Sequence, residues 1–185
     1  IHLLNTSFMK ARFVTKAALS ALALAFAGTL PGVAQQTAAP AVDSVKASAV
    51  EKVFIVKMAD IVQAGLKAGA LDVKAVSGVL NEAVKADVSD RVMGAMVSMA
   101  AGAFPSSAPA VASAAVRSYG SNIREGHVRN VIASAVSSQS NPYASVAPIS
   151  EAVEKVLGNS PVAAAVSSIA VDVAAQTLSL IHISE

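Results

Sequence analysis

The side chains best suited to chemistry lie in one polar stretch of the sequence, YGSNIREGHVR. On the helix expected there, Arg124 and His127 are three residues apart and share a face. Together with Tyr119 they could bind a small anion or contact a partner protein. The competing interpretation is an exposed helix start, in which Glu125 and Arg129 form an i,i+4 ion pair worth about 0.3 kcal/mol. We favour the second interpretation.

The sequence contains no recognised catalytic or metal-binding motif: HExxH, GxSxG, GxGxxG and the P-loop are all absent. His127 is the only histidine apart from one near each chain end, and cysteine is absent. The common zinc sites therefore lack ligands, and a serine nucleophile has a single candidate base. Two acidic pairs, Asp87/Asp90 and Glu151/Glu154, have the i,i+3 spacing of solvated first turns. We expect a protein that is not an enzyme, with no catalytic residue, no metal and no cofactor.

Three methionines recur at intervals of three residues: Met93, Met96 and Met99. Methionine is flexible and polarisable, so such a row could line an adaptable apolar groove for a partner. The same spacing also suits one buried face of a helix, where methionine fills irregular gaps in the core. We favour core filling and keep the groove as the alternative.

Seven helices are expected to position these side chains, because apolar residues recur with the helical period and capping residues, prolines and glycines mark the boundaries. The first helix begins at Asp43 or Ser44, or later at a capping box formed by Ser48 and Glu51. Ser107, Asn122 and Ser145 are expected to cap the fourth, fifth and sixth helices. We expect the helices at about residues 43–68, 72–85, 89–104, 108–118, 123–141, 147–157 and 160–176.

The abundance of alanine and the 3.6-residue period favour helices over strands, although valine alone would suit either. Short connections make successive helices antiparallel neighbours. The expected fold is all-α, with about seven short antiparallel helices arranged as a compact bundle or as a short α-solenoid of helical hairpins.

The hairpins at residues 89–118 and 123–157 resemble each other at an offset of 39 residues. In that alignment Val92 matches Val131, and the aromatic corner residue Phe104 faces Tyr143. Each aromatic would close the open end of its hairpin. The matches fit an internal duplication and equally fit two unrelated hairpins, because alanine- and serine-rich helices match easily by chance.

Residues 9–34 have the order of a secretion signal, with a basic start, a short apolar run and small residues before an expected cleavage after Ala34. The apolar run, residues 17–27, is too short to span a bilayer, so an uncleaved anchor is the less favoured interpretation. We expect an exported bacterial protein, located in the periplasm or outside the cell.

The remaining segments divide the chain further. Residues 1–8 precede Met9 and are expected to be untranslated sequence read in frame. Residues 35–42 form a flexible leader and residues 43–177 a single helical domain. The end of the chain, LSLIHISE at residues 178–185, resembles a translated sequencing adapter and is expected to be an artefactual tail.

The expected mature segment is electrically balanced. Three of the 14 basic residues precede residue 35 and one of the 12 acidic residues follows residue 177, which leaves eleven of each sign between them. Binding of nucleic acid needs a surplus of clustered basic residues, so it is not expected. The mature segment also has no run suited to a transmembrane span.

Two functional hypotheses follow. The first is an exported, non-catalytic helical module that binds another protein or a component of the cell envelope, and it predicts an exposed apolar strip on the first, third or fourth helix. The alternative is a carrier of a small apolar ligand or lipid, and it predicts an enclosed cavity between loosely packed helices. The sequence gives no prediction of the oligomeric state.

Overall fold

The computed structural model describes residues 48–182. The predicted lead, signal and leader segments lie outside the described residues, and so do the last three residues of the predicted tail.

Seven α-helices make up most of the described chain, and this part of the protein contains no β-strand. The expectation of an all-α fold is confirmed. Three short 3-10 helices lie between the α-helices, at Pro105–Ser107, Gly120–Asn122 and Pro161–Ala165. The α-helices are α2 (Ala49–Ala68), α3 (Val73–Lys85), α4 (Asp90–Ala103), α5 (Ala108–Tyr119), α6 (Glu125–Ser137), α7 (Pro142–Leu157) and α8 (Val166–His182).

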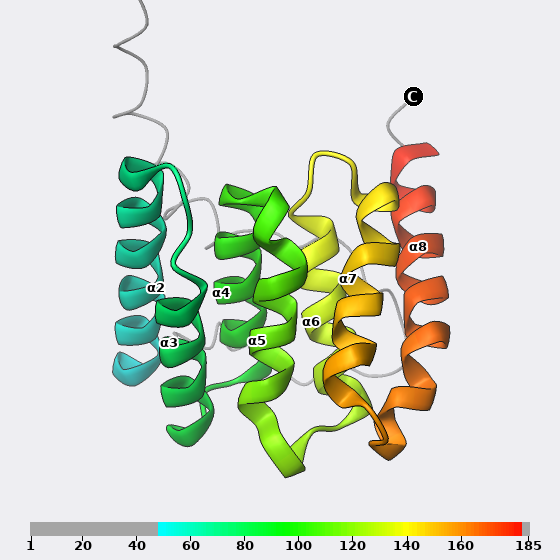
Figure 1. The fold of residues 1–185 in the computed structure, drawn as a ribbon, viewed down its shortest axis with the longest axis horizontal. Helices are drawn as coiled ribbons and strands as arrows, with labels where there is room; N and C mark the ends of the chain where they lie inside the picture. The colour runs from blue at the N-terminus through cyan, green and yellow to red at the C-terminus, as the bar shows by residue number, and fades with distance from the viewer. Residues whose placement is uncertain (1–47, 183–185) are drawn as a thin grey trace, which may run out of the picture. The chain divides into compact units, whose positions relative to one another are not determined.

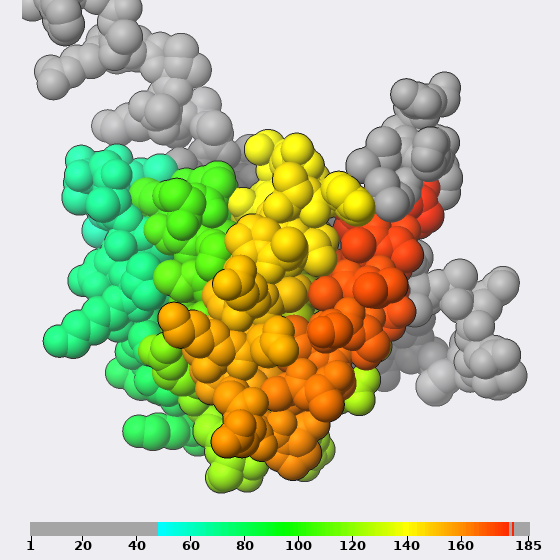
Figure 2. Space-filling view, turned by 45° about the vertical axis from the view of Figure 1, so that its right-hand side comes forward, coloured from blue at the N-terminus to red at the C-terminus, as the bar shows by residue number. Residues whose placement is uncertain are grey.

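The helices stack in two layers (Figure 1). The even-numbered helices α2, α4, α6 and α8 form one layer, and α3, α5 and α7 form the other. Each helix packs chiefly against its neighbours in sequence and against the next helix of its own layer. Figure 2 shows the end of this series, where α7 and α8 lie side by side. The arrangement is that of stacked hairpins in a short α-solenoid rather than helices around one central axis.

The start of α2 is fixed by the later of the two predicted caps. The hydroxyl of Ser48 accepts the backbone N–H of Glu51 at 3.2 Å, and the Glu51 carboxylate accepts the backbone N–H of Ser48 at 2.8 Å. This reciprocal pair satisfies two of the free donors at the helix start. The helix ends at Gly69, whose positive φ of 79° is a conformation that glycine adopts without steric cost.

Three of the predicted caps are wrong. Ser107 makes no capping hydrogen bond with its side chain, because Pro105 starts a 3-10 turn that leads directly into α5. Asn122 lies in a 3-10 turn, and α6 begins two residues later than that cap requires. Ser145 lies inside α7, where its hydroxyl donates to the carbonyl of Pro142 at 2.6 Å.

Pro142 begins a helix instead of ending one. Asn141 caps α7 by accepting the N–H of Ala144 at 3.2 Å, and Pro142 takes the first helical position, where a missing N–H costs little. Pro148 then lies inside the helix and removes the bond to the carbonyl of Ala144. That carbonyl belongs to an exposed residue, so water can take the place of the lost donor.

The last helix is longer than expected. Ser160 caps the 3-10 turn by accepting the N–H of Val162 at 3.4 Å, and α8 continues through His182 rather than ending near Gln176. Among its described side chains, Val166, Ile169 and Val173 are buried.

The offset of 39 residues in the sequence match differs from the offset between the corresponding helices. The starts of α4 and α6 are 35 residues apart (90 and 125), and the starts of α5 and α7 are 34 residues apart (108 and 142). In α4 and α6 the matched positions therefore differ by four residues, about one helical turn, and Val92 and Val131 are both buried. In α5 and α7 they differ by five residues, which changes the helix face: Ala108 is buried, whereas Ala147 is exposed. Phe104 is half-buried and packs over Gly65 of α2, whereas Tyr143 is 56% exposed and does not close its hairpin.

The core is built mainly from valine and alanine, with a few larger side chains. The largest fully buried side chains are Met58, Leu80, Met93, Met96, Ile132, Ile149 and Ile169.

Close approach of α4 and α6 depends on Gly94, where a Cβ atom would lie 2.7 Å from Oγ of Ser134 and 2.9 Å from Oδ1 of Asn130.

Candidate functional site

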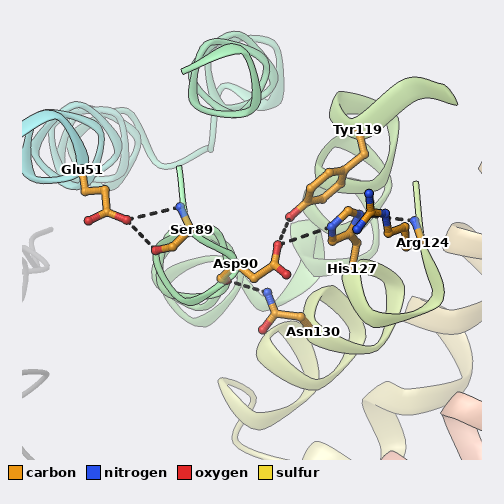
Figure 3. Close-up of polar contacts among 7 residues, drawn as sticks. All are labelled: Glu51, Ser89, Asp90, Tyr119, Arg124, His127 and Asn130. Atoms are coloured by element: carbon orange, nitrogen blue, oxygen red, sulfur yellow. Dashed lines mark hydrogen bonds and ion pairs between the residues drawn. The ribbon is translucent and has the colours of Figure 1, made fainter. Parts of the chain in front are cut away.

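The residues of the predicted polar site meet at one end of the helix stack, where α4 begins, α5 ends and α6 begins (Figure 3). Tyr119 is the last residue of α5, and His127 lies in the first turn of α6. The two rings are stacked, with centroids 4.1 Å apart and planes inclined by 9°. The structure thus brings together Tyr119 and His127, two of the three residues of the possible anion or partner contact.

Asp90, the first residue of α4, completes this cluster. The Tyr119 hydroxyl donates to Oδ1 of Asp90 at 3.2 Å, and Nε2 of His127 lies 3.7 Å from the same oxygen. The second distance is longer than that of a hydrogen bond. The i,i+3 spacing of Asp87 and Asp90 predicts only a pair of solvated acids. Asp90 and Tyr119 are 29 residues apart, and no local sequence pattern predicts the contact between them.

Both ring nitrogens of His127 face a neighbouring group. Nδ1 accepts the backbone N–H of Arg124 at 3.3 Å, so His127 occupies the third helical position that glutamate usually takes in a capping box. When the ring is neutral, this bond assigns its proton to Nε2, which faces Asp90. Neither nitrogen offers a free lone pair to a substrate, and this geometry does not suit a general base.

The hydroxyl of Tyr119 keeps its proton and acts as a hydrogen-bond donor. Burial raises the pKa of Tyr119 far above its ordinary value, and the neighbouring Asp90 carboxylate and its hydrogen bond raise it further. The phenol therefore remains protonated and keeps donating to Asp90 throughout the physiological range.

Arg124 takes part in the cluster through its backbone N–H rather than through its charged side chain. Its N–H binds His127, while its side chain is exposed and makes no ion pair within the described residues. The predicted pair of Glu125 and Arg129 is present at 3.8 Å, but Arg129 makes a closer contact with Asp172 of α8 at 2.8 Å. That longer-range partner was not foreseen.

A row of polar contacts extends from this cluster to α2 (Figure 3). Asn130 of α6 donates to the backbone carbonyl of Asp90 at 2.7 Å. One residue earlier, Ser89 donates its hydroxyl and its backbone N–H to Oε1 of Glu51, at 2.5 and 3.2 Å. The Glu51 carboxylate thus accepts hydrogen bonds from the residues that precede both α2 and α4. These contacts fasten α2, α4, α5 and α6 at one end, and we interpret the cluster as structural.

The methionine row does not form an exposed groove. Met93 and Met96 are fully buried, and Met99 is half-buried against the core. They are covered because α4 packs against α2, α5 and α6. The three methionines therefore fill space in the core, which is the favoured interpretation.

Within residues 48–182, the exposed large apolar side chains lie mainly on α2, the first described helix of its layer. Val50, Val53 and Val56 are each between 51% and 58% exposed, and Leu66 is 46% exposed. We call Val50, Val53 and Val56 the outer face of α2. An exposed apolar strip on the first helix was one of the predicted alternatives, and it is present. The face is uncovered because α2 packs chiefly against α3 and α4.

A depression opens to solvent near the ends of α5 and α7. It has a volume of about 640 Å³, and its apolar lining includes Val116, Ile123, Leu157 and Val162, with Arg117 at its edge. The carrier hypothesis predicted an enclosed cavity, whereas this feature is open.

Comparison of the chain with protein-family models, curated proteins and solved structures found no match. Among the described helices, none is both long and apolar enough to cross a membrane. Within residues 48–182, no three acidic or histidine side chains gather closely enough to hold a metal ion.

Proposed function

We propose that the protein is an exported, non-catalytic helical module that acts by binding another polypeptide through the outer face of α2. The observation that carries this proposal is the exposure of Val50, Val53 and Val56 on the first of the described helices. In a helical solenoid each hairpin covers the next, and the end helix retains an apolar face unless a cap or a partner covers it. Apolar side chains grouped on one helix face are a recurrent means of recognition between proteins.

The polar cluster supports a binding role rather than a chemical one. Its histidine has no free nitrogen, and its tyrosine stays protonated. These groups hold the helix ends in place and leave the surface to provide contacts.

A photoreactive amino acid at position 56 tests the proposal in cells that make the protein. On irradiation we expect a covalent adduct with a polypeptide, which mass spectrometry identifies. The matched control carries the same probe at Lys74, an exposed residue of α3 away from the outer face, and should give none. Equal labelling at both positions, or none at position 56, would contradict the proposal.

Binding of a small apolar ligand is the second candidate, and the apolar lining of the depression between α5 and α7 supports it. A volume of 640 Å³ is within the range of ligand sites, which extends from about 300 to 1,000 Å³. Native mass spectrometry of the purified chain should then detect a bound lipid that the substitution Val116→Arg removes. A spectrum with no added mass before substitution would remove this candidate.

A further inference from the structure

The charges that flank the outer face of α2 are arranged symmetrically about one residue. Lys52 lies four residues before Val56, and Asp60 lies four residues after it. Residues four apart follow one row along a helix, so these three side chains share a surface. Lys52 and Asp60 are exposed, and neither makes an ion pair with another described residue.

This pattern is self-complementary when two copies of the helix run in opposite directions. A two-fold axis at Val56 places Val56 against its own counterpart and the basic position of each copy beside the acidic position of the other. Val53 then lies at the same level along the helix pair as Ala59 of the other copy, and both are apolar. A parallel arrangement in the same register would instead place like charges together, which is unfavourable.

We propose that two copies of this chain associate through an antiparallel pair of α2 helices centred on Val56, with two reciprocal Lys52–Asp60 ion pairs across the interface. The inference rests on the proposed function, because it names the polypeptide that covers the outer face of α2. A helix of 20 residues is about 30 Å long, so the contact is small. An interface of this size belongs to the weak class, and we expect a dissociation constant on the order of 10 µM.

Sedimentation velocity of the full chain, measured across a wide range of concentrations, tests the association. We expect the sedimentation coefficient to rise from that of a monomer to that of a dimer, and high salt to weaken the association. Val56→Glu should leave the protein monomeric, because it brings two carboxylates to the two-fold axis. A monomer at every concentration would overturn the proposal.

Charge exchange tests the geometry. Lys52→Asp alone or Asp60→Lys alone places like charges opposite each other and should weaken the dimer about tenfold or more. The double variant restores opposite charges and should return the dissociation constant to within about threefold of the original. Lys74→Asp, which makes the same change of charge on α3, should have no effect. A double variant as weak as the two single variants would reject the antiparallel pairing.

These outcomes separate the two proposals. If the chain stays monomeric while the probe at position 56 captures a different protein, the self-pairing fails and the proposed function stands. If the probe captures no polypeptide, the proposed function fails. Circular dichroism of each variant checks that its helices are intact, and because the substituted side chains are exposed we expect unchanged spectra.

Discussion

His127 connects three helices without being free to react. Its ring stacks on Tyr119 of α5, one nitrogen receives a backbone N–H at the start of α6, and the other faces Asp90 of α4. A side chain with this many fixed partners limits how the helix ends can move. At the scale of single residues, the cluster therefore contributes to stability through contacts between helices.

Tyr119→Phe should destabilise the protein by about 1 kcal/mol, because it removes the hydrogen bond to Asp90 while keeping the buried ring and its stacking. Urea unfolding followed by circular dichroism measures the change. The matched control is Tyr143→Phe at an exposed position, which should change the free energy of unfolding by less than about 0.5 kcal/mol. Equal effects at the two tyrosines would contradict the role given to the Asp90 contact.

Glu51 should make the protein sensitive to acid. The hydroxyl of Ser89, followed by the backbone N–H groups of Ser48 and Ser89, lowers the pKa of Glu51 below its ordinary value of 4.5. A lowered pKa in the folded state gives stability that is present above 4.5 and is lost as the pH falls through the folded value. Thermal unfolding should therefore show a melting temperature that falls in acid.

Glu51→Gln should lower the melting temperature near neutral pH and reduce its further fall in acid. Part of the acid dependence should remain, because a hydrogen bond from Lys57 and its charge lower the pKa of Glu82. Glu154→Gln, at an exposed residue with no ion pair among the described residues, should keep the full acid dependence. If the melting temperature of Glu51→Gln fell in acid as much as that of the original protein, protonation of Glu51 would not contribute to the pH dependence of stability.

At the scale of helices, the contact between α4 and α6 depends on the absence of a side chain at Gly94. An added Cβ would displace Asn130 from the carbonyl of Asp90, to which it donates at 2.7 Å. We expect Gly94→Ala to destabilise the protein by about 1 to 2 kcal/mol despite the better helix propensity of alanine. Gly78→Ala on α3, where nothing lies within 4 Å, should instead stabilise by up to about 1 kcal/mol. Chemical denaturation of both variants should thus give changes of opposite sign.

The helices could be predicted where the signal is local. The Ser48–Glu51 box, the Asp72 cap and the stop at Gly69 all act within a few residues, and each appears in the structure. The helices expected at residues 123–141 and 147–157 have the wrong boundary between them, because Pro142 begins α7 instead of ending the preceding helix. On local grounds alone a proline fits either role. The contacts of Asp90 with α5 and α6 could not be predicted, since they depend on how distant helices pack.

At the scale of the whole domain, the sequence left open whether the helices form a bundle or a solenoid. Periodicity gives the buried face of each helix but not which helices share a layer. The structure resolves this through small residues such as Gly94, which allow α4 and α6 to pack closely as members of one layer. The exposed face of α2 follows from its place at the end of that layer.

Hydrogen exchange should reveal unequal protection along the stack. Because α2 and α3 have packed neighbours on one side of the series only, we expect their amides to exchange faster than those of α4, α5 and α6. Addition of a partner that covers α2 should slow this exchange. Uniform protection from α2 to α6 would indicate that the described domain opens as one unit.

The chain of contacts from one hairpin to the next has a consequence for evolution and engineering. Since each hairpin depends chiefly on its immediate neighbours, a hairpin inserted between α5 and α6 would need compatible surfaces with only the units that flank it. We therefore expect that the length of the domain can change by whole hairpins without altering the exposed outer face of α2.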